Sequence, residues 1–168
     1  MRIAIDYTSA LNQRAGIGRF TRRIVAALLE LDKENDYLLL GPRRNRFPPP
    51  EGTLIRAHLR RWPLTEWGMT VLWHRLRLGI PVEVFAGAFE LFHAPDFVLP
   101  PLRCRRSILT VHDLSFMVCR EYAPPALVRY LSRVVPDSVS RASLVVADSA
   151  STRRDLMGCL GVAEEKTA

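Results

Sequence analysis

The chain has 168 residues, 48% of them hydrophobic, which is enough to bury one sizeable core and excludes a disordered chain. It carries 24 Lys and Arg against 17 Asp and Glu, a net charge of +7 that suits phosphates, nucleotides or anionic membranes. An Arg-rich coding bias would explain the charge equally well. Three scattered cysteines without a CxxC pair argue against a disulfide framework or a zinc site and fit a reducing cytoplasm, the expected location.

The chain opens with the pattern of a strand, a loop and a helix. Residues 2–6 are predicted to form a strand and residues 7–15 a loop, after which Gly16, Ile17 and Gly18 begin a helix. Apolar residues at three- and four-residue spacing predict the buried face of this helix: Ile17, Phe20, Ile24, Ala27, Leu28 and Leu31. A helix N-terminus after a glycine loop offers unpaired N–H groups and positive potential to an anion. The motif reads GxGxxT, so on local evidence alone a purely connecting loop is slightly favoured.

The rest of the chain alternates between predicted strands and helices. Further strands are expected at residues 37–40, 53–58, 91–93, 107–111 and 144–147. Helices are expected at residues 65–78, at residues 124–141 and from about residue 151, where Asp148 and Ser149 are candidate caps. Several strands are too apolar to have one face exposed to solvent. This order predicts an α/β fold with a Rossmann-like, doubly wound, mostly parallel sheet and helices on both faces.

Polar residues follow two of these strands, where a doubly wound sheet binds its ligands. His112 and Asp113 come directly after the apolar run 107–111, and packing explains such a polar pair poorly. Histidine can donate to a phosphate or a sugar hydroxyl, so function is favoured over a histidine bonded to a carbonyl beside a capping aspartate. His93 ends the strand at 91–93 and Asp96 follows it, where a binding role and a proline turn are equally consistent. No local spacing supports a metal site.

A group of arginines precedes three tryptophans, Trp62, Trp67 and Trp73. A basic helix bearing tryptophan can lie on an anionic membrane, and nucleic acid is a second alternative. A helix that packs its tryptophans into the core beside solvated charges is the favoured interpretation. The arginines are Arg43, Arg44, Arg46, Arg56, Arg60 and Arg61.

Several motifs occur together in a fixed order over nearly the whole chain. They lie at residues 3–6, 16–21, 91–95, 109–114, 147–156 and 161–166. Each motif is modest, but the ordered set resembles the N-terminal domain of the retaining glycosyltransferases of the GT-B fold, family 4, also called glycosyl transferase group 1. The resemblance implies an enzyme of two Rossmann-like domains, with the active site in the cleft between them. Residues 1–160 would be the acceptor-side domain and residues 161–168 the start of a linker, with the donor-binding domain absent from this chain.

The resemblance also implies roles for individual residues. The loop of Gly16, Ile17 and Gly18 would bind the donor diphosphate through backbone amides. His112 would contact the donor sugar near the reaction centre and Asp113 would fix that loop, which makes this pair the predicted catalytic residues. Weaker candidates for the acceptor side are Tyr7, Arg19, His93 and Asp96.

The implied reaction transfers a sugar, with mannose among the candidates, from a nucleotide-sugar to a glycan or lipid-linked acceptor with retention of configuration. No cofactor, metal or nucleic acid is expected, and peripheral contact with the anionic inner face of the cell membrane is left open. The alternatives are a non-catalytic domain that binds a glycan or nucleotide, a GT-B nucleotide-sugar epimerase and a membrane-surface module.

Overall fold

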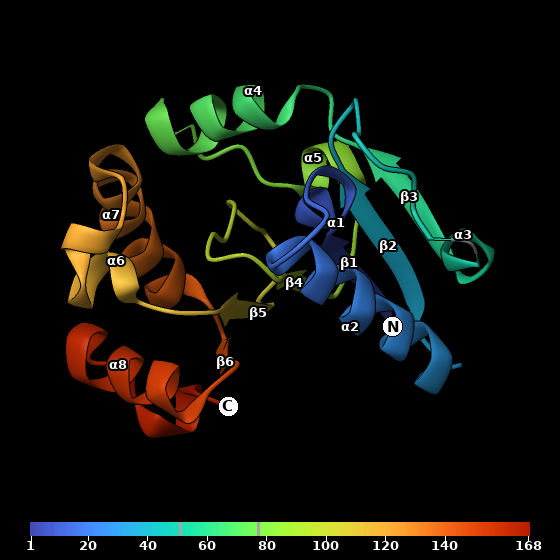
Figure 1. The fold of residues 1–168 in the computed structure, drawn as a ribbon. Helices are drawn as coiled ribbons and strands as arrows, with labels where there is room; N and C mark the ends of the chain where they lie inside the picture. The colour runs from blue at the N-terminus through green and yellow to red at the C-terminus, as the bar shows by residue number, and fades with distance from the viewer. Residues whose placement is uncertain (51, 77) are drawn as a thin grey trace.

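The computed structural model describes residues 1–50, 52–76 and 78–168 and shows a six-stranded sheet in which every neighbouring pair is parallel. The spatial order is β3-β2-β1-β4-β5-β6. This confirms the predicted Rossmann-like α/β fold (Figure 1). The strands are β1 (Arg2–Asp6), β2 (Asp36–Gly41), β3 (Ala57–Arg61), β4 (Leu91–Ala94), β5 (Arg106–Val111) and β6 (Leu144–Ala147).

Helical segments connect these strands. The long helices are α2 (Ile17–Leu31), α7 (Pro125–Arg141) and α8 (Ala150–Leu160). The short ones are α1 (Thr8–Asn12), α3 (Thr53–Arg56), α4 (Glu66–Thr70), α5 (Glu83–Ala86) and α6 (Ser115–Val118), the π-helical turn η1 (Val71–Arg75) and the 3-10 turns η2 (Arg120–Tyr122) and η3 (Glu164–Lys166). No described helix is both long enough and apolar enough to cross a bilayer.

Buried side chains form two cores, one on each face of the sheet, because successive residues of a strand point to opposite faces. In β1, Ile3 and Ile5 belong to the smaller core with residues of α1 and α2. Ala4 belongs to the larger core, which gathers residues of η1, α5, α6, α7 and α8. A sheet covered on both faces explains why its inner strands are apolar throughout.

Two expectations about local structure are wrong. The predicted loop 7–15 contains α1, whose Leu11 is completely buried in the smaller core. The predicted strand 53–58 is instead α3 followed by β3, which lies at the edge of the sheet. Arginines at 60 and 61 interrupt the apolar pattern by which this strand could be recognised in the sequence. An edge strand tolerates such charged side chains because its outer side faces water.

The prediction for the buried face of α2 is also wrong, by about one residue. Its buried residues are Gly18, Thr21, Val25 and Leu29, whereas Leu31 is 82% exposed. Thr21 tolerates burial because its hydroxyl donates to the carbonyl oxygen of Ile17 at 2.8 Å and shares a hydrogen bond with Ser9 Oγ at 2.9 Å. Hydrogen bonds that satisfy a buried hydroxyl are invisible to a pattern of apolar residues.

The expected helix 65–78 is interrupted. It forms α4 and then η1, in which backbone hydrogen bonds span one extra residue. Met69 is buried. Of the tryptophans predicted to pack into the core, Trp62 and Trp73 are buried, whereas Trp67 is 73% exposed.

The last residues pair with the sheet. Ala168 N–H donates to the Val145 carbonyl at 3.0 Å, and Ala147 N–H donates to the Ala168 carbonyl at 2.8 Å. These bonds place the last residues parallel to β6 at the edge of the sheet. Residues 161–168 are therefore packed against β6 here. The predicted domain boundary stays a prediction.

Candidate functional site

The strands β1 and β4 lie side by side at the centre of the sheet, but the chain leaves them in opposite directions. β1 leads on to β2 and β3, whereas β4 leads on to β5 and β6. Such a switch point leaves a crevice outside the carboxyl ends of the two strands. Asp6 ends β1 and Asp96 follows β4, and both line a pocket of about 420 Å³ at this place.

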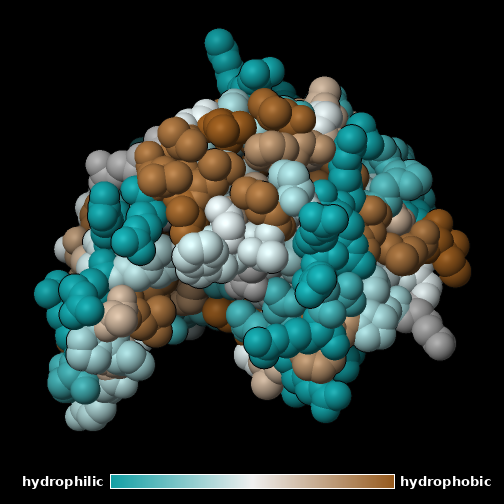
Figure 2. Space-filling model, turned by 90° about the horizontal axis from the view of Figure 1, so that it is seen from above, coloured by the Kyte–Doolittle hydropathy of each residue, from teal (hydrophilic) through white to brown (hydrophobic). Residues whose placement is uncertain are grey.

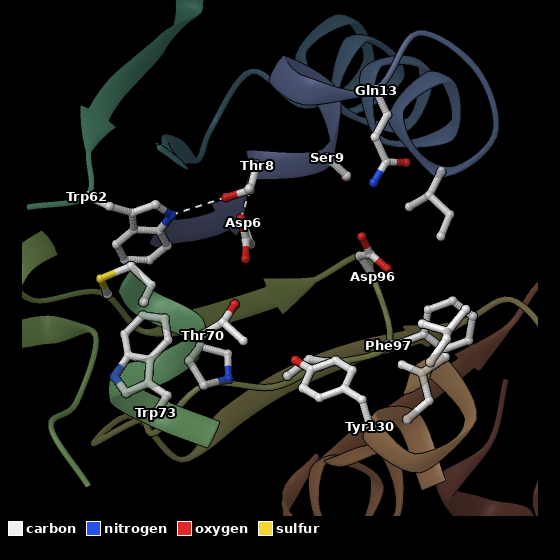
Figure 3. A pocket seen from close by; sticks show the side chains of 16 residues that line it. Asp6, Thr8, Ser9, Gln13, Trp62, Thr70, Trp73, Asp96, Phe97 and Tyr130 are labelled. Carbon is white, nitrogen blue, oxygen red and sulfur yellow. Dashed lines mark hydrogen bonds between the residues drawn. The ribbon is translucent and has the colours of Figure 1, made fainter. Parts of the chain in front are cut away.

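The pocket has a polar wall and a mostly apolar wall, as Figure 3 shows. Polar side chains come from the end of β1, from α1 and its following loop, and from the loop after β4. Apolar and aromatic side chains come from α4, η1 and α7. The polar wall includes Asp6, Thr8, Ser9, Gln13 and Asp96, and the opposite wall includes Trp62, Met69, Trp73, Leu127, Tyr130 and Leu131.

The two pocket tryptophans are fixed in place. The rings of Trp62 and Trp73 meet edge to face, with centroids 5.4 Å apart. Trp62 Nε1 donates to Thr8 Oγ1 at 3.1 Å, and Trp73 Nε1 donates to the Ile80 carbonyl at 2.9 Å. Each indole therefore buries its ring while its single donor is satisfied, which makes this wall rigid before any ligand binds.

Backbone geometry holds the two carboxylates at the pocket. Asp6 Oδ1 accepts a hydrogen bond from Thr8 N–H at 2.9 Å, which turns the chain from β1 into α1. After β4, the Asp96 carbonyl accepts from Val98 N–H. Phe97, at the tip of this turn, has a φ of 48° and is the one non-glycine residue with positive φ in the described chain. Backbone strain of this kind persists where the surrounding structure enforces it, often at binding sites.

His112 lies one residue beyond β5 and is held on both ring nitrogens. Nδ1 lies 3.0 Å from Asp148 Oδ2, and Nε2 lies 2.9 Å from the Pro95 carbonyl oxygen. Both partners are hydrogen-bond acceptors, so each ring nitrogen faces an acceptor group of the protein. The edges of Phe20 and Phe97 also meet the ring, with centroids 4.9 and 5.5 Å away. His112 thus joins the ends of β4, β5 and β6 to the first turn of α2.

Asp113 fixes the loop after β5. Its Oδ1 accepts from Ser115 N–H at 2.9 Å and from Ser115 Oγ at 2.6 Å, at the start of α6. Ser149 caps α8, as expected, by accepting from Thr152 N–H at 3.0 Å. Asp148, the other candidate cap, pairs with His112 instead.

The glycine loop lies at the start of α2, next to His112. Gly16 precedes α2 with a φ of 56°, and Phe20 N–H donates to its carbonyl at 3.0 Å. The Phe20 ring meets His112, so the start of α2 and His112 are neighbours. Gly18 also has a packing reason, because a Cβ there would lie 2.2 Å from the Gln13 carbonyl oxygen. Of this loop, Ile17 reaches the pocket.

The weaker candidates are dispersed. Tyr7 is fully buried in the smaller core, where burial raises the pKa of its hydroxyl, and Arg19 is exposed on α2. His93 is 6% exposed and lies 3.0 Å from Thr110 Oγ1, and its burial lowers its pKa to about 4. The structure therefore brings Asp96, but not Tyr7, Arg19 or His93, to the pocket.

Sequence reasoning missed several pocket residues. Asp6 was assigned only to a strand, and the tryptophans only to a core helix. The end of β1 at a switch point was the available signal for Asp6. Tyr130 and Leu131, in the first half of α7, pack against the larger core and also line the pocket. Figure 3 shows the Tyr130 ring at the pocket. In the described residues, no group of three or more His, Cys, Asp or Glu is arranged to hold a metal ion.

Comparison with known proteins bears on part of the chain. Over 103 residues, 61% of its length, the sequence is 34% identical to O-antigen chain mannosyltransferase B of Escherichia coli. The expected resemblance to a glycosyltransferase is confirmed. The matched part is about a quarter of that relative's length, 26%. No protein-family model matches the chain.

Proposed function

We propose that this chain is the N-terminal, acceptor-binding domain of a retaining glycosyltransferase that uses a nucleotide-sugar donor. The observation that carries the proposal is the pocket at the β1–β4 switch point, where Asp6 and Asp96 face an aromatic wall. The similarity to a mannosyltransferase supports it independently, and makes a mannose-bearing nucleotide-sugar the first donor to test.

The acceptor occupies this pocket in the proposal. A sugar has hydroxyl groups on its edges and C–H groups on its faces, so it needs hydrogen-bonding groups beside apolar surface. Carboxylates such as Asp6 and Asp96 accept hydrogen bonds from hydroxyls, while Trp62 and Tyr130 offer aromatic surface to a ring. A rigid wall lowers the entropic cost of holding the acceptor in one orientation.

The donor lies above the start of α2, beside the acceptor. In the proposed reaction the acceptor oxygen bonds to the anomeric carbon while the bond from that carbon to the diphosphate oxygen breaks, on the same face of the sugar. The departing diphosphate takes the proton of the acceptor hydroxyl. Negative charge that develops on the diphosphate meets the unpaired N–H groups and the positive end of α2 after Gly16. No step requires a metal or a cofactor.

His112 lies beside the start of that helix in this scheme. Its bonds to Asp148 and to the Pro95 carbonyl orient the ring, and Asp113 orders the loop that follows. The nucleotide would be held by a second domain, C-terminal to this one.

One observation favours a second candidate, a glycan-binding domain without catalysis. Both nitrogens of His112 already have partners within the protein. A domain that only binds a glycan would use the pocket in the same way and would not depend on His112.

Transfer assays on the full-length protein test the proposal. Donors that differ in sugar and base are incubated with glycan acceptors, and the anomeric configuration of any product is read by NMR. In Asp96→Asn, KM for the acceptor should rise about tenfold or more because a charge-assisted hydrogen bond is lost, with KM for the donor unchanged. Glu30→Gln, an exposed carboxylate on α2, is the control. Absence of transfer with every donor, or an epimerised donor as product, would contradict the proposal.

A further inference from the structure

A second pocket lies beside the first. It has a volume of about 530 Å³ and is lined in part by Asn12, Arg44, Asn45, Arg46, Trp67 and Thr70. No Asp or Glu is found among the described residues that line it. Figure 2 looks onto the side of the molecule on which α4 lies and shows hydrophilic and hydrophobic regions next to one another there.

Five of the six arginines of the sequence cluster separate into two kinds. Arg56, Arg60 and Arg61 donate to backbone carbonyls, for example Arg60 Nη1 to Ala86 at 2.8 Å and Arg61 Nη1 to Pro42 at 3.0 Å. They therefore serve the fold. Arg44 and Arg46 are exposed, and neither side chain forms an ion pair within the described residues.

The loop that carries these two arginines is held in place. Its backbone N–H groups at Arg46 and Phe47 both donate to the Leu11 carbonyl, at 3.1 and 3.0 Å. The Arg14 guanidinium lies 4.9 Å from the centre of the Phe47 ring. An anchored loop presents its cationic groups at fixed positions, so less entropy is lost when a ligand binds.

The second pocket adjoins the first. Thr70 of α4 lines both pockets, and α1 contributes Thr8 and Ser9 to the first and Asn12 to the second. The two pockets are therefore neighbours on either side of Thr70. Two guanidinium groups, two side-chain amides and an exposed indole suit a phosphate ester attached to a sugar, because arginine forms paired hydrogen bonds with phosphate oxygens.

We propose that this second pocket binds the phosphate or diphosphate group of an acceptor whose sugar occupies the first pocket. The acceptor is then a glycan phosphate ester, and Arg44 and Arg46 bind its anionic group while Trp67 packs against its neighbouring ring. This inference rests on the proposed function for the acceptor's sugar, but the anion site itself can be tested without transfer. Recognition in a concave pocket with amide donors favours a single phosphate ester over the diffuse charge of a membrane surface.

Binding of inorganic diphosphate to the full-length protein is the first test, measured by calorimetry with the nucleotide site saturated by nucleoside diphosphate. The variant is Arg44→Gln/Arg46→Gln. Its control, Arg43→Gln/Arg105→Gln, removes the same charge from exposed arginines outside the pocket. We expect affinity to fall about tenfold or more in the first variant and to stay within twofold in the second. Equal losses in both variants, or no loss in either, would overturn the anion site.

Acceptor kinetics form the second arm. KM for a sugar linked through diphosphate to a short alkyl chain should rise about tenfold or more in Arg44→Gln/Arg46→Gln, while KM for the matching phosphate-free alkyl glycoside stays unchanged. If KM rises for both acceptors, the two arginines do not bind the phosphate group specifically, and the proposal is overturned. If wild-type protein transfers to neither acceptor yet binds diphosphate through these arginines, the proposed function fails and the anion site stands.

Vesicles distinguish the source of the phosphate. Flotation with phosphatidylglycerol vesicles reports binding to a charged membrane surface. The proposal expects no difference in flotation between the two double variants. Loss of flotation in Arg44→Gln/Arg46→Gln alone, with KM for the diphosphate acceptor unchanged, would replace the proposal by a membrane contact.

Discussion

Two histidines on neighbouring strands show how the interior of the sheet differs from its carboxyl edge. His93 lies within β4, is almost fully buried, and has one neutral partner, the Thr110 hydroxyl. His112 lies one residue beyond β5 and contacts a carboxylate and a carbonyl. The interior therefore keeps its histidine neutral, whereas the edge holds its histidine between two acceptor groups. Position relative to the strand end, rather than residue type, decides which histidine can meet an anionic ligand.

The largest effect expected at the edge is on catalysis. His112→Ala removes the imidazole that lies next to the start of α2, where the proposed reaction places the donor, so kcat for transfer by the full-length protein should fall about 100-fold or more. Removing the exposed His58 in the same way should leave kcat unchanged. Wild-type kcat in His112→Ala would contradict a catalytic role for His112 and favour a role of this domain in glycan binding alone.

In the interior, the largest expected effect is the dependence of the free energy of unfolding on pH. The pKa of His93 is lowered from 6.5 to about 4 in the folded state by burial. Above pH 6.5 the residue is neutral in both states. As pH falls below 6.5, the unfolded chain gains a proton that the folded protein does not, so the free energy of unfolding should drop by about 3 kcal/mol in total by pH 4.

Urea denaturation at each pH measures this loss. His93→Gln should remove this part of the pH dependence, and His58→Gln should leave it unchanged. If the two variants behave alike, His93 does not stay neutral in the folded protein.

The glycine loop tests whether packing shapes the edge as well. In Gly18→Ala the new Cβ would lie 2.2 Å from the Gln13 carbonyl oxygen and 2.6 Å from that of Ser9, so stability should fall by about 1–3 kcal/mol. Gly158→Ala in α8, where no atom lies within 4 Å, should instead stabilise by about 0.5–1 kcal/mol. Thermal or urea unfolding compares them. If Gly18→Ala is as stable as wild type, packing does not explain this glycine, and close approach of a ligand to the backbone becomes the explanation.

The smallest effect is expected at Tyr7, an interior residue that adjoins the edge. Thr53 lies near its hydroxyl, but no hydrogen bond forms there among the described residues. Tyr7→Phe should therefore change stability by less than about 0.5 kcal/mol. KM for the acceptor should also stay unchanged, and a rise in that KM would show that the hydroxyl reaches the ligand.

Local patterns predicted the parallel sheet and most of its strands, because apolar runs and helical spacing are properties of neighbouring residues. Five strands, the long helices α2 and α7, and the Ser149 cap of α8 agree with the sequence to within a residue or two. α1 and β3 were missed, because Leu11 finds its burial, and β3 its edge position, only in the complete fold. The buried face of α2 was misplaced because Thr21 is buried through a hydrogen bond with Ser9.

For the site, the sequence by itself determined which polar residues end the strands, Asp6, Asp96 and His112 among them. Only the tertiary structure decided which of them meet. Strand order places Asp6 and Asp96 at one switch point, brings Asp148 and Pro95 to His112, and separates the arginines that hold the fold from the two that line a pocket. The physical reason is that a binding site forms from segments far apart in the chain, whose distances depend on the packing of the whole sheet.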